Sequence, residues 1–176
     1  MVRADLIPAL RVLGAVTVLG LPLGWLWSRL APAEIAAVVA GPGAGQIGAG
    51  QIGVLPLPGQ SEHRFDAMAT FVLIGLAVGI LTGVALWLWR GRRGPVVLVA
   101  AVLGSLVAAW LAMRVGLWLV DWFYPLAGPK PGDVITRAPV LESTWVVVAQ
   151  PFGVAIAYSL TVSWNGAEDL GRVPCE

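Results

Sequence analysis

Charged side chains are scarce in this sequence. They make up 12% of the residues, whereas 58% are hydrophobic, against about 25% charged and about 45–50% apolar in an average soluble domain. The formal net charge is only +1, and no stretch alternates basic with aromatic residues, so we expect no nucleic-acid partner. The balance instead favours a chain that lies in a lipid bilayer.

Cysteine and histidine are almost absent as well. The single cysteine, Cys175, excludes a disulfide within the chain. The single histidine, His63, lacks a second histidine or a nearby cysteine with which to complete a metal site. The sequence also has no Walker lysine, no Gly-x-Ser-x-Gly turn and no His-Glu-x-x-His helix. We therefore predict no catalytic residue, no metal and no cofactor, and we interpret the chain as non-enzymatic.

Four long uncharged runs separate the short clusters of charge. Crossing about 30 Å of hydrocarbon takes about 20 apolar residues, a length that each run reaches or nearly reaches. The sequence thus predicts an all-α membrane protein, a single integral domain over 1–176 with four transmembrane helices near 10–30, 66–90, 94–122 and 143–165. Its outer loops are 31–65 and 123–142, and 90–94 is a tight turn. A cleaved signal peptide ending at Ala31 to Ala33 is the alternative interpretation of the first run.

The tight turn predicts the orientation. It carries Arg90, Arg92 and Arg93 with no acid beside them, and the positive-inside rule places such a turn in the cytoplasm. Both termini of a four-helix chain are then cytoplasmic too, and the expected location is the plasma membrane. All tryptophans except Trp110 fall at the predicted helix boundaries, where indole rings prefer to lie.

Small residues recur at intervals of four on one face of the second and third predicted helices: Gly75, Gly79 and Gly83, then Gly104 and Ala108. Such faces let helices approach closely in lipid. Because the turn between these helices is short, we predict an antiparallel hairpin in which the two faces meet. Homodimerisation through the glycines is the alternative. Pro22 and Pro151 predict kinks in the first and fourth helices.

Polar residues gather where the second predicted helix begins and the third ends: His63, Arg64, Asp66, Arg114 and Asp121. A rise of 1.5 Å per residue places Asp66 within about 6 Å of the height of Arg114, and His63 level with Asp121. We predict that Asp66 pairs with Arg114 and that His63 or Arg64 pairs with Asp121. Alternatively, Arg114 extends to the lipid headgroups and this helix start is simply solvated.

The first outer loop contains the tract "GAGQIGAGQIG", Gly43 to Gly53, in which Gly-x-Gly-x-x-Gly occurs twice. A dinucleotide site needs a helix after the last glycine, and Pro56 and Pro58 forbid a regular one. We therefore predict no nucleotide and interpret the tract as a tandem "AGQIG" that lengthens a loop. The apolar runs on either side of it fit a short β-hairpin or strandless loops, and "DVIT" is the strand-like piece of the second outer loop.

Several short motifs occur between Glu62 and Gly116: "FDA" at the start of the second helix, "GPV" after the arginines, "LGSL-AAW" and "RVG". A further motif, "NG-EDLG", lies at Asn165 to Gly171. By these motifs the chain resembles an actinobacterial family of small membrane proteins known only as a domain of unknown function. The likeness extends over about two-thirds of the chain. The resemblance implies a four-helix plasma-membrane protein and brings no activity, cofactor or catalytic residue.

Two classes of function remain open. The first is a non-enzymatic accessory or interaction protein of the cell envelope, which binds a membrane-protein partner or a second copy. The second is a small carrier or channel component whose path passes Pro22, Pro151 and Arg114. No Asp, Glu, Lys or His lies at mid-depth in the predicted spans, and such groups mark transport paths, so the first class is favoured. A lipid-modifying enzyme would have only His63 and Asp66 as candidate residues.

Overall fold

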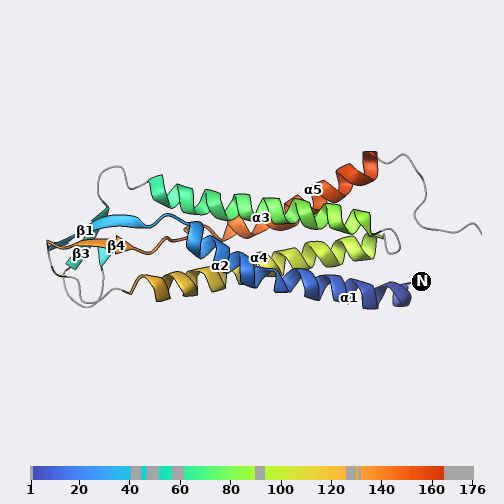
Figure 1. The fold of residues 1–176 in the computed structure, drawn as a ribbon, viewed down its shortest axis with the longest axis horizontal. Coiled ribbons are helices and arrows are strands. Elements are labelled where there is room, and N and C mark those ends of the chain that lie inside the picture. Colours follow the sequence, from blue (N-terminus) through green and yellow to red (C-terminus); the bar gives the residue numbers. More distant parts are fainter. Residues whose placement is uncertain are drawn as a thin grey trace, which may run out of the picture.

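A computed structural model describes residues 2–40, 45–46, 52–56, 62–89, 94–125, 130 and 132–164. A bundle of helices carries a small sheet beyond one end (Figure 1). The helices are α1 (Val2–Val18), α2 (Gly20–Leu30), α3 (Glu62–Leu88), α4 (Pro95–Phe123), the 3₁₀ helix η2 (Thr144–Val148) and α5 (Ala149–Trp164). The strands are β1 (Glu34–Ala40), β2 (Gly45–Gln46), β3 (Ile52–Pro56) and β4 (Val134–Arg137).

Among the described residues, four helical stretches are long and apolar enough to cross a membrane: Leu6–Leu30, Glu62–Leu88, Pro95–Phe123 and Thr144–Trp164. The four expected helices are therefore confirmed as apolar helices of spanning length. The first begins at Val2 rather than near residue 10. The predicted turn at 90–94 falls outside the described residues except for Gly94, and Cys175 and the segment Asn165 to Gly171 lie outside them altogether.

Proline accounts for two irregularities in these helices. The first is broken between α1 and α2, where the amide of Leu19 donates to the carbonyl of Val16 at 3.1 Å, three residues back. Pro22 lacks the amide that would bond Val18, and its ring crowds that carbonyl. The last of the four helical stretches consists of the 3₁₀ helix η2 followed by α5, and Pro151 lies near the start of α5. Each predicted kink position therefore lies beside a departure from a continuous α-helix.

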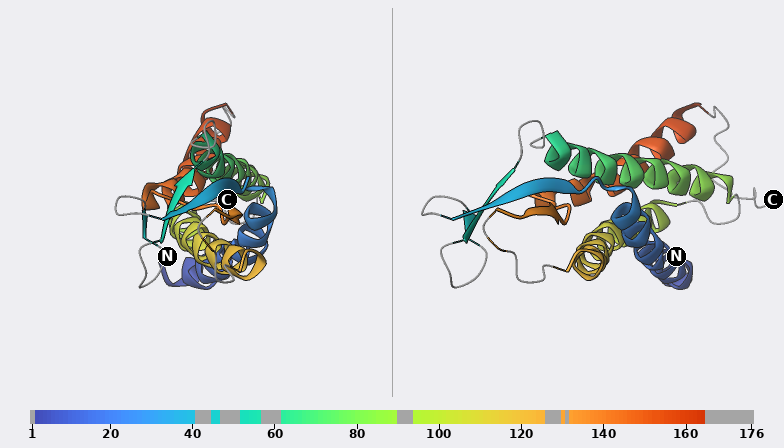
Figure 2. Two further views of the ribbon diagram at one scale, coloured as in Figure 1. Left: turned by 90° about the vertical axis from the view of Figure 1, so that its left-hand side faces the viewer. Right: turned by 60° about the vertical axis from the view of Figure 1, so that its left-hand side comes forward.

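The helices pair differently from the prediction. Viewed along the bundle, α3 and α5 lie on one side, and α1, α2 and α4 lie on the other (Figure 2). Gly75, Gly79 and Gly83 of α3 face α5, whereas Gly104 of α4 faces Leu13 and Val16 of α1. Ala108 of α4 lies against Gly20 of α2.

The prediction that these two small-residue faces meet each other is wrong. A small residue permits close approach but does not select the neighbour, and each face has found the backbone of a different helix. The glycine face of α3 is covered within the chain, by α5. It is therefore not free for the homodimer contact that was the alternative.

The described parts of the two segments that were predicted as outer loops form a four-stranded sheet in the order β2-β3-β1-β4, so the all-α class describes only the bundle. β1 and β3 make the expected antiparallel hairpin, with Val38 opposite Val54, and β4 adds the "DVIT" segment on the other side of β1. The interpretation of the glycine tract as loop is wrong for Gly45–Gln46, which is β2, whereas Ile52 and Gly53 begin β3 as part of the apolar run "IGVLPLP", which was expected to be able to form a strand. The rest of the tract lies outside the described residues.

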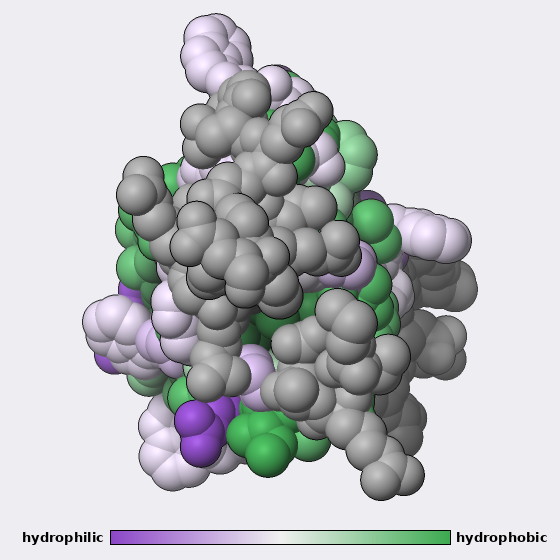
Figure 3. Space-filling view, turned by 90° about the vertical axis from the view of Figure 1, so that its right-hand side faces the viewer, coloured by the Kyte–Doolittle hydropathy of each residue, from purple (hydrophilic) through white to green (hydrophobic). Residues whose placement is uncertain are grey.

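Buried apolar side chains form two clusters along the bundle. The cluster nearer the sheet centres on Trp27, Phe71 and Val120, and the other centres on Val16, Ala101 and Val154. Many large apolar side chains remain exposed on the helix flanks. Figure 3 looks onto the end opposite the sheet, where the coloured residues are mostly hydrophobic or of intermediate hydropathy and strongly hydrophilic ones are few. The bundle therefore has an apolar exterior as well as an apolar core.

Candidate functional site

Arg64 joins three elements where the sheet meets the bundle. Its Nε lies 2.7 Å from Oε1 of Glu34, at the start of β1, and its Nη1 lies 2.9 Å from Oε1 of Glu142, just before η2. Arg64 itself belongs to the first turn of α3. We call these three residues the junction cluster. It fixes the first residue of the sheet onto the beginnings of two helical segments.

The two carboxylates of the junction cluster differ in exposure. The side chain of Glu34 is 2% exposed, that of Arg64 is 33% exposed and that of Glu142 is 49% exposed. A buried carboxylate is costly unless a cation and hydrogen bonds compensate it. Glu34 Oε2 has no hydrogen-bond partner among the described residues, so Glu34 depends on Arg64 for compensation. The half-exposed Glu142 contributes less, because solvent screens its interaction.

Trp27 holds the bundle together just below the junction cluster. Its side chain is fully buried, and its Nε1 donates a hydrogen bond of 2.9 Å to the carbonyl of Ala67 in α3. Its ring meets that of Phe71 edge to face, with the centroids 6.0 Å apart. Gly116 of α4 leaves no room for a side chain against the indole. Trp27, which was expected to lie at a membrane boundary, is therefore a buried residue that links α2, α3 and α4.

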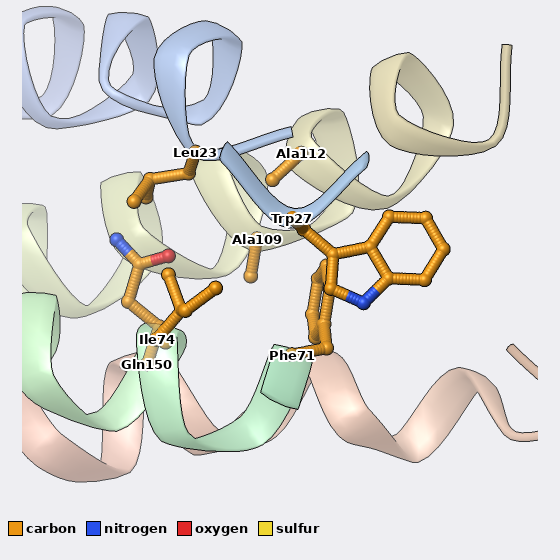
Figure 4. A pocket seen from close by; sticks show the side chains of 8 residues that line it. Leu23, Trp27, Phe71, Ile74, Ala109, Ala112 and Gln150 are labelled. Atoms are coloured by element: carbon orange, nitrogen blue, oxygen red, sulfur yellow. The ribbon is translucent and has the colours of Figure 1, made fainter. Parts of the chain in front are cut away.

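A cavity of about 10 Å³ lies beside Trp27, between the same helices and α5 (Figure 4). Its lining includes Leu23, Ile74, Ala109 and the amide of Gln150. Gln150 is 1% exposed, and its Nε2 has no hydrogen-bond partner within the described chain. A cavity of this size has room for about one water molecule, which would satisfy that amide.

The other predicted polar residues are not brought together as expected. His63 Nδ1 lies 3.6 Å from Oδ2 of Asp66, one turn along the same helix. The Arg114 guanidinium lies 5.9 Å from the centroid of the Trp110 ring. Asp121 is exposed and forms no ion pair with the described residues.

The predicted pairs of Asp66 with Arg114, and of His63 or Arg64 with Asp121, are therefore wrong. They assumed that α3 and α4 run side by side, whereas α3 packs along α5. Glu34 and Glu142, the actual partners of Arg64, were missed. The sequence offers only one weak signal for them, since each lies close to one end of a segment that was predicted as an outer loop. Their distance from Arg64 depends on how the sheet docks.

Among the described residues, no group of three or more His, Cys, Asp and Glu side chains is arranged to hold a metal. The junction cluster consists of charges that compensate one another, and the cavity beside Trp27 is too small for a substrate. Both features position structural elements rather than reacting atoms.

Comparison with known proteins identifies relatives but no activity. Residues 16–130 match the family described as "Protein of unknown function (DUF2567)". An uncharacterized protein of Mycobacterium leprae is 31% identical over 171 residues, which cover 89% of this chain and 83% of the relative. An uncharacterized protein of Mycobacterium tuberculosis H37Rv is 29% identical over 173 residues, which cover 88% and 86% respectively. No solved structure matches the chain.

Proposed function

This chain belongs to the actinobacterial DUF2567 family, and on that premise we propose that it is a multi-pass plasma-membrane protein that binds a partner of the cell envelope without catalysis. The observation that carries this proposal is the junction cluster. Arg64 ties β1 to the starts of α3 and η2, so the sheet has a fixed position on the bundle. A sheet held in this way is suited to presenting a binding surface.

The exterior of the bundle supports insertion in a membrane. Within the best 18-residue window of each apolar helix, between 22% and 50% of the residues are buried inside the protein. The exposed remainder includes Leu73, Leu81 and Leu103, side chains that hydrocarbon solvates better than water does. The packing of Trp27 against α3 and α4 favours retention of the first helix over its removal as a signal peptide.

The arrangement of the helix ends supports a single orientation. The beginning of α1, the end of α3 and the beginning of α4 lie at one end of the bundle, and the sheet lies at the other (Figure 1). Arg90, Arg92 and Arg93 follow α3 in the sequence, which favours a cytoplasmic location for that end. We place the sheet outside the cytoplasm, and both termini inside.

The edge of β4 is the surface that we assign to the partner. β4 is the last strand of the sheet, and no described strand pairs with its outer edge. The amide of Val38 donates to the carbonyl of Asp133 at 2.8 Å, and in this register Ile135 and Arg137 turn their backbone groups toward β1. The backbone groups of Val134 and Thr136 therefore point outward. An extended segment of an envelope protein could add a strand there.

A carrier or channel gains less support. Transport needs a wet path through the apolar helices, and polar groups normally line such a path. The cavity at Gln150 has room for only about one water molecule, and its neighbours are Leu23, Ile74 and alanines.

Substitution at Thr136 tests the assignment. Thr136→Pro removes an outward amide, which an edge strand tolerates, whereas the control Thr136→Val keeps the amide and changes only the side chain. After purification in mild detergent, a stoichiometric partner identified by mass spectrometry should remain with the wild type and Thr136→Val but be lost with Thr136→Pro. Equal capture by both variants would reject the β4 edge. Transport by the purified protein alone in liposomes would reject the accessory function.

A further inference from the structure

A groove of about 360 Å³ runs between α1 and α3, at the end of the bundle away from the sheet. The groove exists because α1 packs along α4 whereas α3 packs along α5. As a result, α1 and α3 separate on the side of Leu19 that is away from the sheet. The residues that line it are Arg11, Val12, Ala15, Val16, Leu19, Thr82, Ala85, Leu86 and Trp89. Its two walls therefore come from segments that lie far apart in the sequence.

The walls of the groove are apolar along their length. Val12, Val16 and Leu86 are buried side chains. The hydroxyl of Thr82 donates to the carbonyl of Val78 in its own helix at 2.7 Å, so it does not require a hydrogen bond from an occupant. An occupant that matches this lining is a hydrocarbon.

One cation lies in the lining of this apolar groove. Arg11 is exposed and forms no hydrogen bond or ion pair with the described residues. By contrast, the guanidinium of Arg29 lies 4.1 Å from the centroid of the Phe123 ring, and Arg64 has two carboxylates. Arg11 is therefore available to an anion outside the protein.

The length of the groove fits the upper part of a lipid chain. Arg11 and Trp89 lie nearer the end of the bundle, whereas Leu19 and Thr82 lie deeper. At 1.5 Å per residue, the walls extend about 10–12 Å inward from Arg11 and Trp89. A helix about 10 Å across would occupy roughly 900 Å³ over that length, well above the volume of the groove. An unbranched acyl chain is much narrower than a helix.

We propose that this groove binds an acyl chain of an anionic phospholipid, whose headgroup phosphate pairs with Arg11. The proposal rests on the membrane insertion and orientation given above, which place the groove in the cytoplasmic leaflet. Basic pockets between transmembrane helices on that side are suited to anionic headgroups. The apolar walls hold the chain, and Arg11 favours anionic over zwitterionic lipid.

Lipid titration followed by native mass spectrometry tests whether the charge of Arg11 contributes to binding of an anionic lipid. The probes are dioleoylphosphatidylglycerol and dioleoylphosphatidylcholine, added to the purified full chain in detergent. Arg11→Gln should weaken phosphatidylglycerol binding about fivefold, the effect of one cation near a headgroup, and leave phosphatidylcholine binding unchanged. Arg114→Gln removes the same charge from an exposed arginine outside the groove lining, and should bind both lipids as the wild type does. Equal losses of phosphatidylglycerol binding in Arg11→Gln and Arg114→Gln would overturn the proposal.

A second pair of variants tests the groove itself. Ala85→Leu fills it from α3, whereas Ala77→Leu adds the same bulk to an exposed position of α3 outside the lining. Ala85→Leu alone should reduce binding of both lipids. The proposal would be overturned if Ala85→Leu left lipid binding unchanged, or if it reduced association between copies of the chain instead of lipid binding.

Carbonate extraction of the membranes distinguishes a failure of the proposed function from a failure of the groove proposal alone. If the wild-type chain is released from membranes, the proposed function fails. If the chain stays in the membrane but the Arg11 and Ala85 variants bind lipid as the wild type does, only the groove proposal fails.

Discussion

Gly79 lies where α3 comes closest to α5. A Cβ at this position would collide with the carbonyl oxygen of Gln150 and approach the Cα of Gly153 to 3.1 Å. Both neighbours are backbone atoms, which cannot rotate away. We predict that Gly79→Ala lowers the free energy of unfolding by about 1–3 kcal/mol, the usual cost of excess volume in a packed interior. Unfolding in mixed detergent micelles, followed by circular dichroism, measures this change.

Gly14 provides the matched control for Gly79. It also lies within a helix, but a Cβ there would have no atom within 4 Å. Gly14→Ala should therefore be neutral or stabilising by up to about 1 kcal/mol, because alanine favours the helix more than glycine does. Equal destabilisation by both substitutions would contradict the packing of α3 on α5.

At the scale of elements, the sequence predicted what local pattern determines. Uncharged runs of spanning length marked the helices, and prolines marked two of their irregularities. The apolar runs beside the glycine tract and "DVIT" marked three strands. Each of these signals acts within a few residues of where it appears.

Pairing between elements could not be predicted in the same way. The glycines of α3 showed that some helix approaches closely, but nothing in their spacing distinguishes α4 from α5. The environment of Trp27 could not be predicted either, because an indole at a helix end is suited both to a membrane boundary and to a buried core. The partners of Arg64 depended on the docking of the sheet, which is a long-range feature.

The junction cluster should behave as the connection between sheet and bundle. We predict that Arg64→Gln destabilises the fold by about 3 kcal/mol, because it leaves the buried Glu34 carboxylate without its cation. Glu142→Gln should cost less than about 1 kcal/mol, because that carboxylate is half exposed. The effect should be local as well, with faster hydrogen exchange at the amides of β1 in Arg64→Gln.

A double variant separates charge compensation from packing at this junction. Glu34→Gln in the Arg64→Gln background removes the uncompensated charge and should restore part of the lost stability. If the double variant is as unstable as Arg64→Gln alone, the carboxylate of Glu34 is not what Arg64 stabilises.

At the scale of the whole molecule, the two ends of the bundle differ in chemistry. One end carries the sheet, the junction cluster and the β4 edge. The other carries the apolar groove with Arg11. This asymmetry suits a protein that contacts lipid on one side of the membrane and a protein partner on the other.

Cysteine labelling in intact cells tests that orientation. Cys175 is the only cysteine in the sequence, so it reports the carboxyl-terminal side without any substitution. Lys130→Cys in a Cys175→Ser background reports the side of β4, since Lys130 is exposed close to that strand. A membrane-impermeant maleimide should label Lys130→Cys in intact cells and Cys175 only after the membrane is opened. The reverse pattern would invert the topology, and it would move the groove to the outer leaflet. Because Arg90, Arg92 and Arg93 supply the bias, their replacement by glutamine should make the labelling of both sites mixed.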